Sequence, residues 1–321
     1  MITRIVYPSA LEYWLNEKGI PYRYWDAGKP AQGGEKKRGR AGITETVKRL
    51  NFSAPVHVAV PKGTCRKKTT AIIYHMIPKG LPEGSFIRMA DDVMISSPEM
   101  CFLQAACVLP LHQLVKLACN LCAIYVLDPY EEYGQRNREP ITTVSNITDY
   151  LQKAKGLKGV HLAKQAIQYA YDRANSPKEV NLVTIAALPI HDGGYGLTKM
   201  RLNYDVRLSE KGAEHLGRGT CCCDFVWLEK KVVLEYDSNL SHLNRKQHAR
   251  DKARITALSL SGYKVISVTA EDILTYGKTE DLFRLIRHTL GERANTSRLQ
   301  EYSEKRRAVV MDIMFSENKN Y

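Results

Sequence analysis

The pattern of apolar and polar residues in the second half of the chain predicts strands that alternate with helices. Runs with a period of two are typical of half-buried strands, and a longer run with spaced apolar residues is typical of a helix. Between Thr220 and Thr269 this gives two strands joined by a tight turn, a helix that Gly262 can end, and a third strand. The predicted elements are strands over residues 221–228, 231–237 and 263–269 and a helix over residues 244–261. A strand, helix and strand of this length form a right-handed crossover with parallel strands, so we predict an α/β fold.

The second predicted strand has one apolar face and one acidic face. Side chains alternate along a strand, so Glu235 and Asp237 share the face opposite to the apolar one. If the hairpin turns between Glu229 and Lys230, Asp224 on the first strand lies directly opposite Glu235. These two carboxylates would then face each other at about 5 Å. Like charges at that distance destabilise a sheet unless a cation lies between them or one is protonated.

A divalent metal ion explains such an acidic pair. Mg²⁺ takes one or two carboxylates together with water and phosphate oxygens, and phosphodiester cleavage needs the same cation. The alternative is that Asp224, Glu235 and Asp237 pair with some of the 47 lysine and arginine residues on an exposed sheet face. The hairpin by itself leaves both interpretations open.

Further candidate residues lie at the end of the second strand and beyond it. Asp237 and His242 fall at the carboxyl end of this strand, where sheets with parallel crossovers place their ligands. In the predicted helix, Arg250 and Arg254 lie four residues apart on one face, where they can contact phosphate. The alternative is a solvated face with local ion pairs, such as Asp251 with Arg254.

These residues together carry a family resemblance. The sequence CDFVWLEKKVVLEYDSNLSHLNRKQHARDKARITALSLSGYKVISVT resembles the catalytic segment of nuclease-like domains related to very-short-patch repair endonucleases, within the PD-(D/E)XK superfamily. The shared pattern is an aspartate before a hydrophobic strand, a Glu-x-Asp pair at the end of the next strand, a nearby histidine, an arginine and an aspartate in the helix, and a glycine before the closing strand. The resemblance implies a restriction-endonuclease-like mixed sheet flanked by helices, over about Asn175 to Leu290. It also implies DNA as substrate and Mg²⁺ or Mn²⁺ as cofactor.

The resemblance extends upstream to the sequence SPKE at residues 176–179. It resembles the start of the helix from which this superfamily contributes an additional acidic residue, and Glu179 would be that residue. Ser-x-x-Glu is also a helix capping box, in which Glu179 serves only the backbone. Both interpretations of Glu179 stay open.

The chain departs from the superfamily pattern at two positions. Cys223 stands where proline would precede the aspartate, and Asp237 stands where lysine would follow the glutamate. The lysine is credited with orienting or activating water, so His242 or a basic residue such as Arg250 would have to replace it. Histidine is the better candidate, because its reference pKa lies nearest neutrality. The departure also leaves open a domain that binds DNA without cutting it.

The first half of the chain gives fewer signals. The run SPEMCFLQAACVLPLHQLVKLACNLCAIYVLDP resembles the central part of abortive-infection antitoxins of the AbiEi type, over about residues 50–130. That resemblance implies a DNA-binding or regulatory module in a prokaryotic toxin–antitoxin or phage-defence setting, with a protein partner from the same system. The polar segment 128–140 is bounded by prolines and is predicted as a linker. We therefore predict an N-terminal α+β domain over residues 1–135 and a nuclease-like domain with a helical lead-in over residues 141–321.

The charge of the chain favours a polyanionic partner. Its formal net charge is +13, and each phosphate that a basic side chain neutralises releases condensed counterions. Lys36, Lys37 and Arg38 lie in a glycine-rich, loop-like segment and are candidates for DNA contact. The sequence has neither an uninterrupted apolar run of membrane-spanning length nor a secretory signal at its N-terminus, so we expect a cytoplasmic protein without membrane contact.

The eight cysteines are expected to be thiols in a reducing compartment. Cys119 and Cys122 form a CxxC sequence inside an apolar run, without the second ligand pair that zinc usually needs. We interpret them as small buried residues rather than metal ligands.

Two functional hypotheses follow. The first is a Mg²⁺-dependent DNA endonuclease or nickase in which Asp224, Glu235 and Glu179 hold the metal, Asp237 completes the acidic cluster and His242 assists proton transfer. The second is a non-catalytic DNA-binding regulator of the antitoxin type that retains the fold. An RNA-directed nuclease has only the positive charge in its favour.

Overall fold

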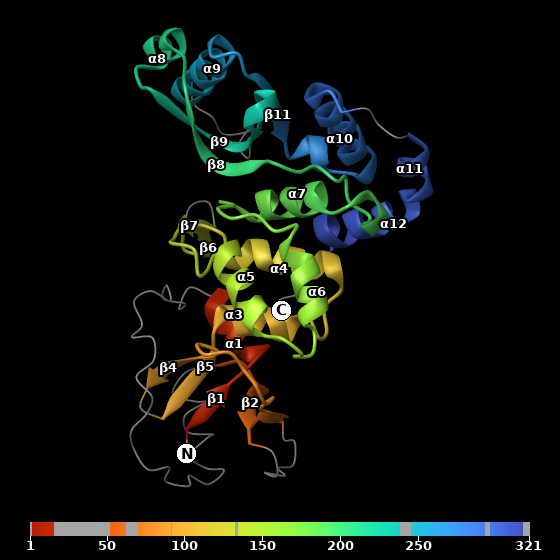
Figure 1. Cartoon of the computed structure of the whole chain (residues 1–321). Helices are drawn as coiled ribbons and strands as arrows, with labels where there is room; N and C mark the ends of the chain where they lie inside the picture. Colours follow the sequence, from red (N-terminus) through yellow and green to blue (C-terminus); the bar gives the residue numbers. More distant parts are fainter. Residues whose placement is uncertain are drawn as a thin grey trace. The chain divides into compact units, whose positions relative to one another are not determined.

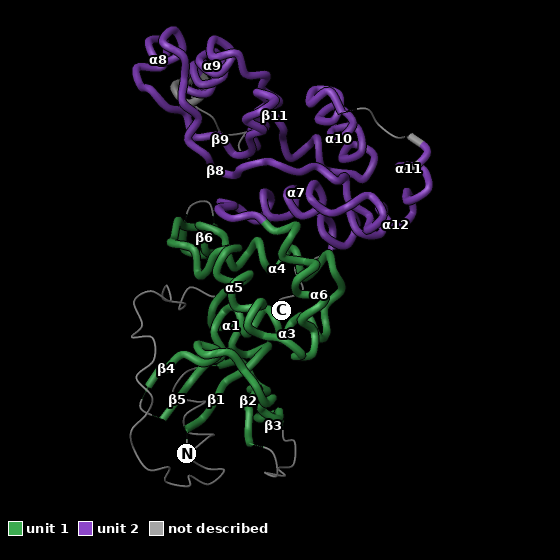
Figure 2. The backbone as a smooth tube through the Cα atoms, viewed as in Figure 1, with its two compact units in different colours: residues 1–170, 318–321 green, residues 171–317 purple. Residues whose placement is uncertain are grey.

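The computed structural model describes residues 2–15, 52–61, 70–90, 92–131, 134–237, 245–292 and 296–316. The chain forms two compact units (Figure 2), which divide between Ala170 and Tyr171. Unit 1 comprises residues 1–170, with 318–321 assigned to it, and unit 2 comprises residues 171–317. The fold is α/β, with a mixed sheet in each unit. No helix within the described ranges is long and apolar enough to cross a membrane.

Unit 1 contains a five-stranded mixed sheet in the order β3-β2-β1-β5-β4. Its strands are β1 (Thr3–Ile5), β2 (Val56–Val60), β3 (Ile72–Met76), β4 (Phe86–Ala90) and β5 (Val93–Ser96). The pairs β1–β5 and β2–β3 are parallel, whereas β1–β2 and β4–β5 are antiparallel. The central strands β1 and β5 bury Ile5, Val93 and Ile95 completely, so the middle of this sheet contributes to the core of unit 1.

Helices supply the rest of the core of unit 1. They are α1 (Ser9–Leu15), α3 (Pro98–Ala105), α4 (Leu111–Leu121), α5 (Val144–Lys153) and α6 (Val160–Ile167). Ser97 caps α3 by accepting a hydrogen bond from the backbone N–H of Met100, and Pro98 occupies the first turn. The side chains of Trp14, Phe102 and Leu117 are fully buried.

The segment expected as a linker, residues 128–140, instead includes a strand. β7 (Gln135–Asn137) pairs with β6 (Tyr125–Leu127) in a two-stranded antiparallel sheet. Asp128 accepts hydrogen bonds from the backbone N–H of Tyr130 at 3.1 Å and from Nε of Arg136 at 3.2 Å. The polar composition of this segment therefore reflects a small hairpin held by side-chain bonds within unit 1.

Unit 2 contains a four-stranded mixed sheet in the order β11-β10-β9-β8 (Figure 1). Its strands are β8 (Arg201–Arg207), β9 (Thr220–Trp227), β10 (Val232–Asp237) and β11 (Lys264–Thr269). β10 and β11 are parallel, as the predicted crossover requires, and the other neighbours are antiparallel. The turn between β9 and β10 is a short 3-10 helix, Leu228–Lys230, followed by Lys231 at a φ of 49°.

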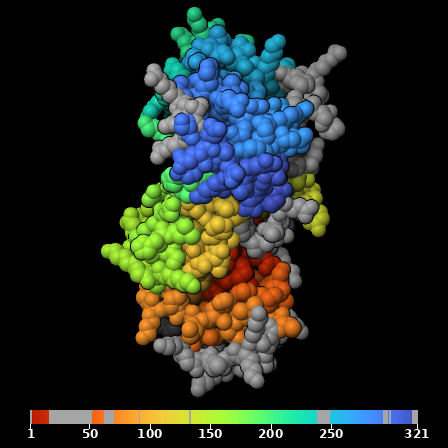
Figure 3. Space-filling model, turned by 90° about the vertical axis from the view of Figure 1, so that its right-hand side faces the viewer, coloured from red at the N-terminus to blue at the C-terminus, as the bar shows by residue number. Residues whose placement is uncertain are grey.

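Unit 2 also contains α-helices before, between and after these strands. They are α7 (Pro177–Ala187), α8 (Glu210–Leu216), α9 (Arg245–Leu260), α10 (Tyr276–Leu290), α11 (Thr296–Glu301) and α12 (Ser303–Val310). Ala257 and Leu258 of α9 are fully buried in a cluster with Val206, Val226 and Val233 of the sheet. Helices α10 to α12 form the blue part of unit 2 in the space-filling view (Figure 3). The crossover helix α9 thus packs on the sheet through Ala257 and Leu258 in its C-terminal half.

Candidate active site

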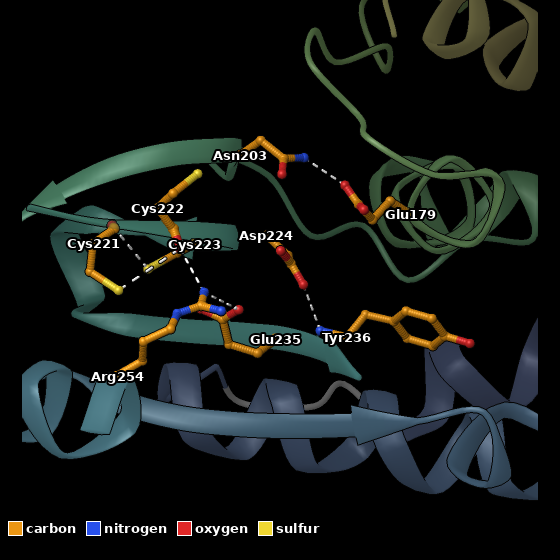
Figure 4. A network of polar contacts seen from close by, with 9 residues as sticks. All are labelled: Glu179, Asn203, Cys221, Cys222, Cys223, Asp224, Glu235, Tyr236 and Arg254. Carbon is orange, nitrogen blue, oxygen red and sulfur yellow. Dashed lines mark hydrogen bonds and ion pairs between the residues drawn. The ribbon is translucent and has the colours of Figure 1, made fainter. Parts of the chain in front are cut away.

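Three acidic side chains from separate elements of unit 2 lie in one cluster. Glu179 comes from the first turn of α7, Asp224 from β9 and Glu235 from β10 (Figure 4). Burial is the largest cause that raises the pKa of Glu179 to about 7 and that of Glu235 to about 8, and the charge of Asp224 is the second. The structure therefore brings together the three residues that the sequence suggested as metal ligands.

Asp224 lies at the end of the backbone pairing between β9 and β10. The paired residues are Val232 with Trp227, Val233 with Val226 and Leu234 with Phe225. The same register, continued by one residue, sets Asp224 opposite Glu235, as the sequence analysis predicted. At this level Oδ2 of Asp224 accepts a hydrogen bond from the backbone N–H of Tyr236 at 2.8 Å. Burial raises the pKa of Asp224, although the hydrogen bond from Tyr236 favours the charged form.

The two oxygens of Glu235 have different surroundings. Oε2 contacts Nη2 of Arg254 at 3.0 Å, in an ion pair whose side chains are 17% and 33% exposed for Glu235 and Arg254. Oε1 is buried next to the thiol of Cys223, whose hydrogen bond to the Glu235 carboxyl lowers the pKa of Glu235. In the view of Figure 4, Arg254 reaches Glu235 from the left and Asp224 lies to its right. The carboxyl of Glu235 is thus held between the guanidinium of Arg254 and the thiol of Cys223.

Glu179 is part of the capping box of α7, and its role as an additional acidic residue of the site stays a prediction. Ser176 caps α7 by accepting from the backbone N–H of Glu179 at 3.2 Å. Oε1 of Glu179 accepts from Oγ of Ser176 at 2.9 Å, and Oε2 accepts from the backbone N–H of Asn175 at 2.9 Å. The charge of Asp224 nevertheless acts on the same carboxyl. The cap orients Glu179 and places it within electrostatic reach of Asp224.

Asn203 is a member of the cluster that the sequence analysis missed. Its Nδ2 donates to Oε2 of Glu179 at 2.6 Å and to the carbonyl oxygen of Arg173 at 2.8 Å. It is buried on β8 with a φ of 44°, between the pairs Leu202–Phe225 and Tyr204–Cys223. Asparagine tolerates this left-handed conformation better than most residues, and a lone asparagine in a strand is the signal that could have identified it.

Cys223 occupies the position where the superfamily pattern has proline. It is fully buried with Cys221 in the cluster formed by Val206, Val233 and α9. Cys223 therefore contributes to packing, and Asp224 lies on β9 although a cysteine precedes it in place of proline. Cys119 and Cys122 are also buried, in the core of unit 1.

The remaining candidate residues lie outside the cluster or outside the described part of the chain. Asp237 ends β10 and is paired in register with Thr269 of β11, and its part in the cluster stays a prediction. Arg250 is exposed on α9, and its contact with phosphate stays a prediction. Arg254 was also a candidate for phosphate contact, but its guanidinium donates a hydrogen bond to Glu235. His242, Lys36, Lys37 and Arg38 lie outside the described residues.

The donor set can be compared with the needs of a divalent ion. In the part of the chain that the structure describes, no group of three or more His, Cys, Asp and Glu side chains is arranged to hold a metal ion. Both carboxylate oxygens of Glu179 accept hydrogen bonds, Oδ2 of Asp224 accepts one from Tyr236, and Oε2 of Glu235 pairs with Arg254. Mg²⁺ is bound in many sites by one or two carboxylates with water completing the shell. Asp224 and Glu235 are carboxylates of the kind that such a site uses, and Arg254 already compensates the charge of Glu235.

Comparison of the chain with protein-family models, curated proteins and solved structures gives no match. The chemistry of the site is therefore inferred from its own geometry and charge.

Proposed function

We propose that unit 2 is a metal-dependent endonuclease or nickase domain of the PD-(D/E)XK type that acts on DNA. The observation that supports this proposal is the gathering of Asp224, Glu235 and Glu179 from two adjacent strands and a preceding helix. Like charges in a partly buried place need compensation, which Arg254 gives to Glu235 and protonation gives where the pKa is raised. A divalent cation would compensate them, and the phosphate backbone would complete its coordination.

Each residue of the cluster has a distinct part in this proposal. Asp224 and Glu235 would hold Mg²⁺ or Mn²⁺, with Glu179 beside them. When bound, the cation supplies stabilisation of charge on the phosphate and makes water more acidic. Glu179, with a pKa of about 7, can exchange a proton near neutral pH. Asp237 and His242 keep the roles that the sequence suggested, as a further acidic residue and as an aid to proton transfer.

The charge of the chain supports DNA as the partner. A net charge of +13 favours association with a phosphate backbone. Arg250 on the exposed surface of α9, together with Lys36, Lys37 and Arg38, would contribute to this contact. We place the activity in a prokaryotic defence or toxin–antitoxin system on the resemblance of unit 1 to AbiEi-type antitoxins, with a cytoplasmic location.

The proposal is tested by incubating the purified protein with supercoiled plasmid and Mg²⁺ or Mn²⁺. We expect nicking that chelation abolishes and that Asp224→Asn and Glu235→Gln each remove. Glu229→Gln is the matched control, because Glu229 lies at the turn of the same hairpin, is 71% exposed and pairs with the exposed Lys199. Nicking that survives both substitutions in the cluster would contradict the proposal.

A second candidate is a DNA-binding regulator that retains the fold without cutting. The ion pair between Arg254 and Glu235 favours it, because a cation already compensates one of the carboxylates. The absence of the motif lysine at Asp237 points the same way. The plasmid experiment separates the two functions. Salt-sensitive binding without any nicking in either metal supports the regulator.

A further inference from the structure

One row of paired residues crosses all five strands of the sheet in unit 1. In strand order from β3 to β4, the residues paired in register are His75, Ala59, Arg4, Met94 and Arg88. Residues that are paired in register have their side chains on the same face of a sheet. Arg4 therefore shares one face with His75 and Arg88, each at a distance of about 10 Å along the row, because neighbouring strands lie about 4.8 Å apart.

The opposite face of this sheet is the core face. Ile5 and Val58 follow and precede residues of the row on β1 and β2, and they are 0% and 1% exposed. In contrast, Arg4 and Arg88 are partly exposed and His75 is exposed. The row thus lies on the outer face of the sheet, which is the face that carries Arg4, His75 and Arg88.

The charged groups of the outer face have one sign. The basic and imidazole side chains of the five strands are Arg4, His57, His75 and Arg88, and these strands contain no aspartate or glutamate. His57 lies two residues before Ala59 on β2, so it belongs to the same face. Within the part of the chain that the structure describes, neither arginine has an ion pair or a side-chain hydrogen bond. The two guanidinium groups are therefore available to a partner.

The chemistry of this face suits a chain of phosphates with bases attached. Arginine stays charged, and its planar guanidinium donates hydrogen bonds to phosphate. The rings of His57 and His75 are stacked with their centroids 4.9 Å apart, and Nδ1 of His57 lies 2.8 Å from Nε2 of His75. Histidine rings are among the side chains on which unpaired bases stack. Cations in the middle of the sheet and stacked rings near its β3 edge thus complement two parts of one ligand.

We propose that the outer face of the sheet in unit 1 binds a single-stranded nucleic acid, with phosphates at Arg4 and Arg88 and a base at the His57–His75 pair. The major groove of a duplex admits a helix or a two-stranded ribbon, whereas a broad sheet face suits a single strand with its bases turned toward it. This inference goes beyond the proposed function and does not rest on it, because it concerns unit 1 and requires no cleavage.

The test is the affinity of the full chain for a fluorescent single-stranded DNA oligonucleotide, measured by anisotropy with a chelator present to prevent metal-dependent cleavage. The variant Arg4→Gln/Arg88→Gln removes both cations and keeps part of each aliphatic stem. Each phosphate contact contributes about 0.7 to the slope of log affinity against log salt for a single strand, so the slope should fall by about 1.4. At about 0.1 M salt the affinity should fall by about 10- to 30-fold.

The matched control is Lys153→Gln/Lys155→Gln. It removes the same number of charges from exposed positions of unit 1, one at the end of α5 and one just after it. This variant should leave the slope unaltered and change the affinity by less than about twofold. Arg4→Lys/Arg88→Lys keeps the charges and should keep most of the slope. Thermal unfolding shows whether each variant is folded.

Footprinting of the wild-type chain locates the ligand without any substitution. Met94 is partly exposed and lies in the row between Arg4 and Arg88, so the bound oligonucleotide should protect it from oxidation by hydroxyl radicals. Met311 of unit 2 is 44% exposed and serves as the reference that binding leaves unaltered.

A reduced slope in the arginine variant together with protection of Met94 supports the inference. An RNA oligonucleotide of the same sequence then shows which of the two single strands binds more tightly. An unaltered slope in the folded Arg4→Gln/Arg88→Gln variant, an unprotected Met94, or tighter binding of the duplex than of the single strand overturns the inference. Each of these results leaves the plasmid test of unit 2 unaffected, so the two proposals fail separately.

Discussion

The carboxylate of Asp224 accepts a hydrogen bond from the backbone N–H of Tyr236, so a side chain of β9 binds the backbone of β10 just beyond their last paired residues, Phe225 and Leu234. This bond sets the carboxyl of Asp224 beside that of Glu235, whose backbone precedes Tyr236. It also stabilises the charged form of Asp224, which burial disfavours. The hairpin and the acidic cluster are therefore one structural feature.

The metal-free protein should lose stability as the pH rises from about 5 to about 9. The pKa values of Glu179 and Glu235 are raised from 4.5 to about 7 and about 8 by burial and by the charge of Asp224. Both groups therefore bind protons more tightly in the folded chain. Their contribution to stability is complete below pH 4.5 and is lost as the pH rises through 7 and 8.

Thermal unfolding in the presence of a chelator measures this effect. Glu179→Gln and Glu235→Gln should each flatten the decline, because an amide does not titrate. A wild-type profile that rises over the same pH range, or that the two variants leave unaltered, would show that these carboxyls are not protonated in the folded protein.

Replacement of Asn203 should change the pKa of Glu179, to which its side chain is hydrogen-bonded. The hydrogen bond from Asn203 lowers the pKa of Glu179, so Asn203→Ala should raise that pKa above about 7. Loss of the buried bond should also destabilise the protein by about 1–3 kcal/mol. Asn203→Gly loses the same bond but tolerates the φ of 44°, so it should be about 1 kcal/mol more stable than Asn203→Ala.

Carbon-13 NMR of the glutamate carboxyls follows the pKa, and chemical denaturation follows the stability. The two variants should raise the pKa of Glu179 by the same amount, since both remove the amide of Asn203. A Glu179 that titrates as in the wild type would mean that Asn203 has only a backbone role.

Removal of Glu280 should destabilise unit 2 strongly, away from the acidic cluster. Oε1 of Glu280 accepts from Nε of Arg306 and from the hydroxyl of Tyr195, each at 2.7 Å. The side chain of Arg306 is only 4% exposed, so Glu280→Ala leaves a buried charge unpaired. We expect a loss of about 3–5 kcal/mol in the free energy of unfolding.

Asp281→Ala is the matched control for Glu280→Ala. Asp281 is the next residue of α10, is 71% exposed, and pairs with Arg284, which is 76% exposed. An exposed pair of this kind contributes about 1 kcal/mol or less. Denaturation midpoints of the two variants that coincide would contradict the importance of the buried pair.

Local patterns predicted the elements around the acidic site. The positions of Glu229 and Lys230 and the period of two set the register of the hairpin, and Gly262, with a φ of 82°, follows the end of the crossover helix. The capping sequence at Ser176 likewise marked the start of α7. These features depend on neighbours within a few residues, so they can be read directly from the chain.

Long-range contacts were beyond the reach of such patterns. The bond from Asn203 to Glu179 joins residues 24 positions apart, and that from Arg254 to Glu235 joins residues 19 apart. Which of several arginines on α9 reaches the sheet depends on how the helix packs. The hairpin at Asp128 was mistaken for a linker because its bonds come from polar side chains, which also mark loops.

A crystal of the protein grown with Mn²⁺ tests the central claim most directly. Anomalous scattering of manganese locates the ion without assumptions about its ligands. We predict a peak bound by the carboxylates of Asp224 and Glu235. The absence of an anomalous peak at this position, in a crystal grown at a concentration of Mn²⁺ that supports nicking, would contradict the account.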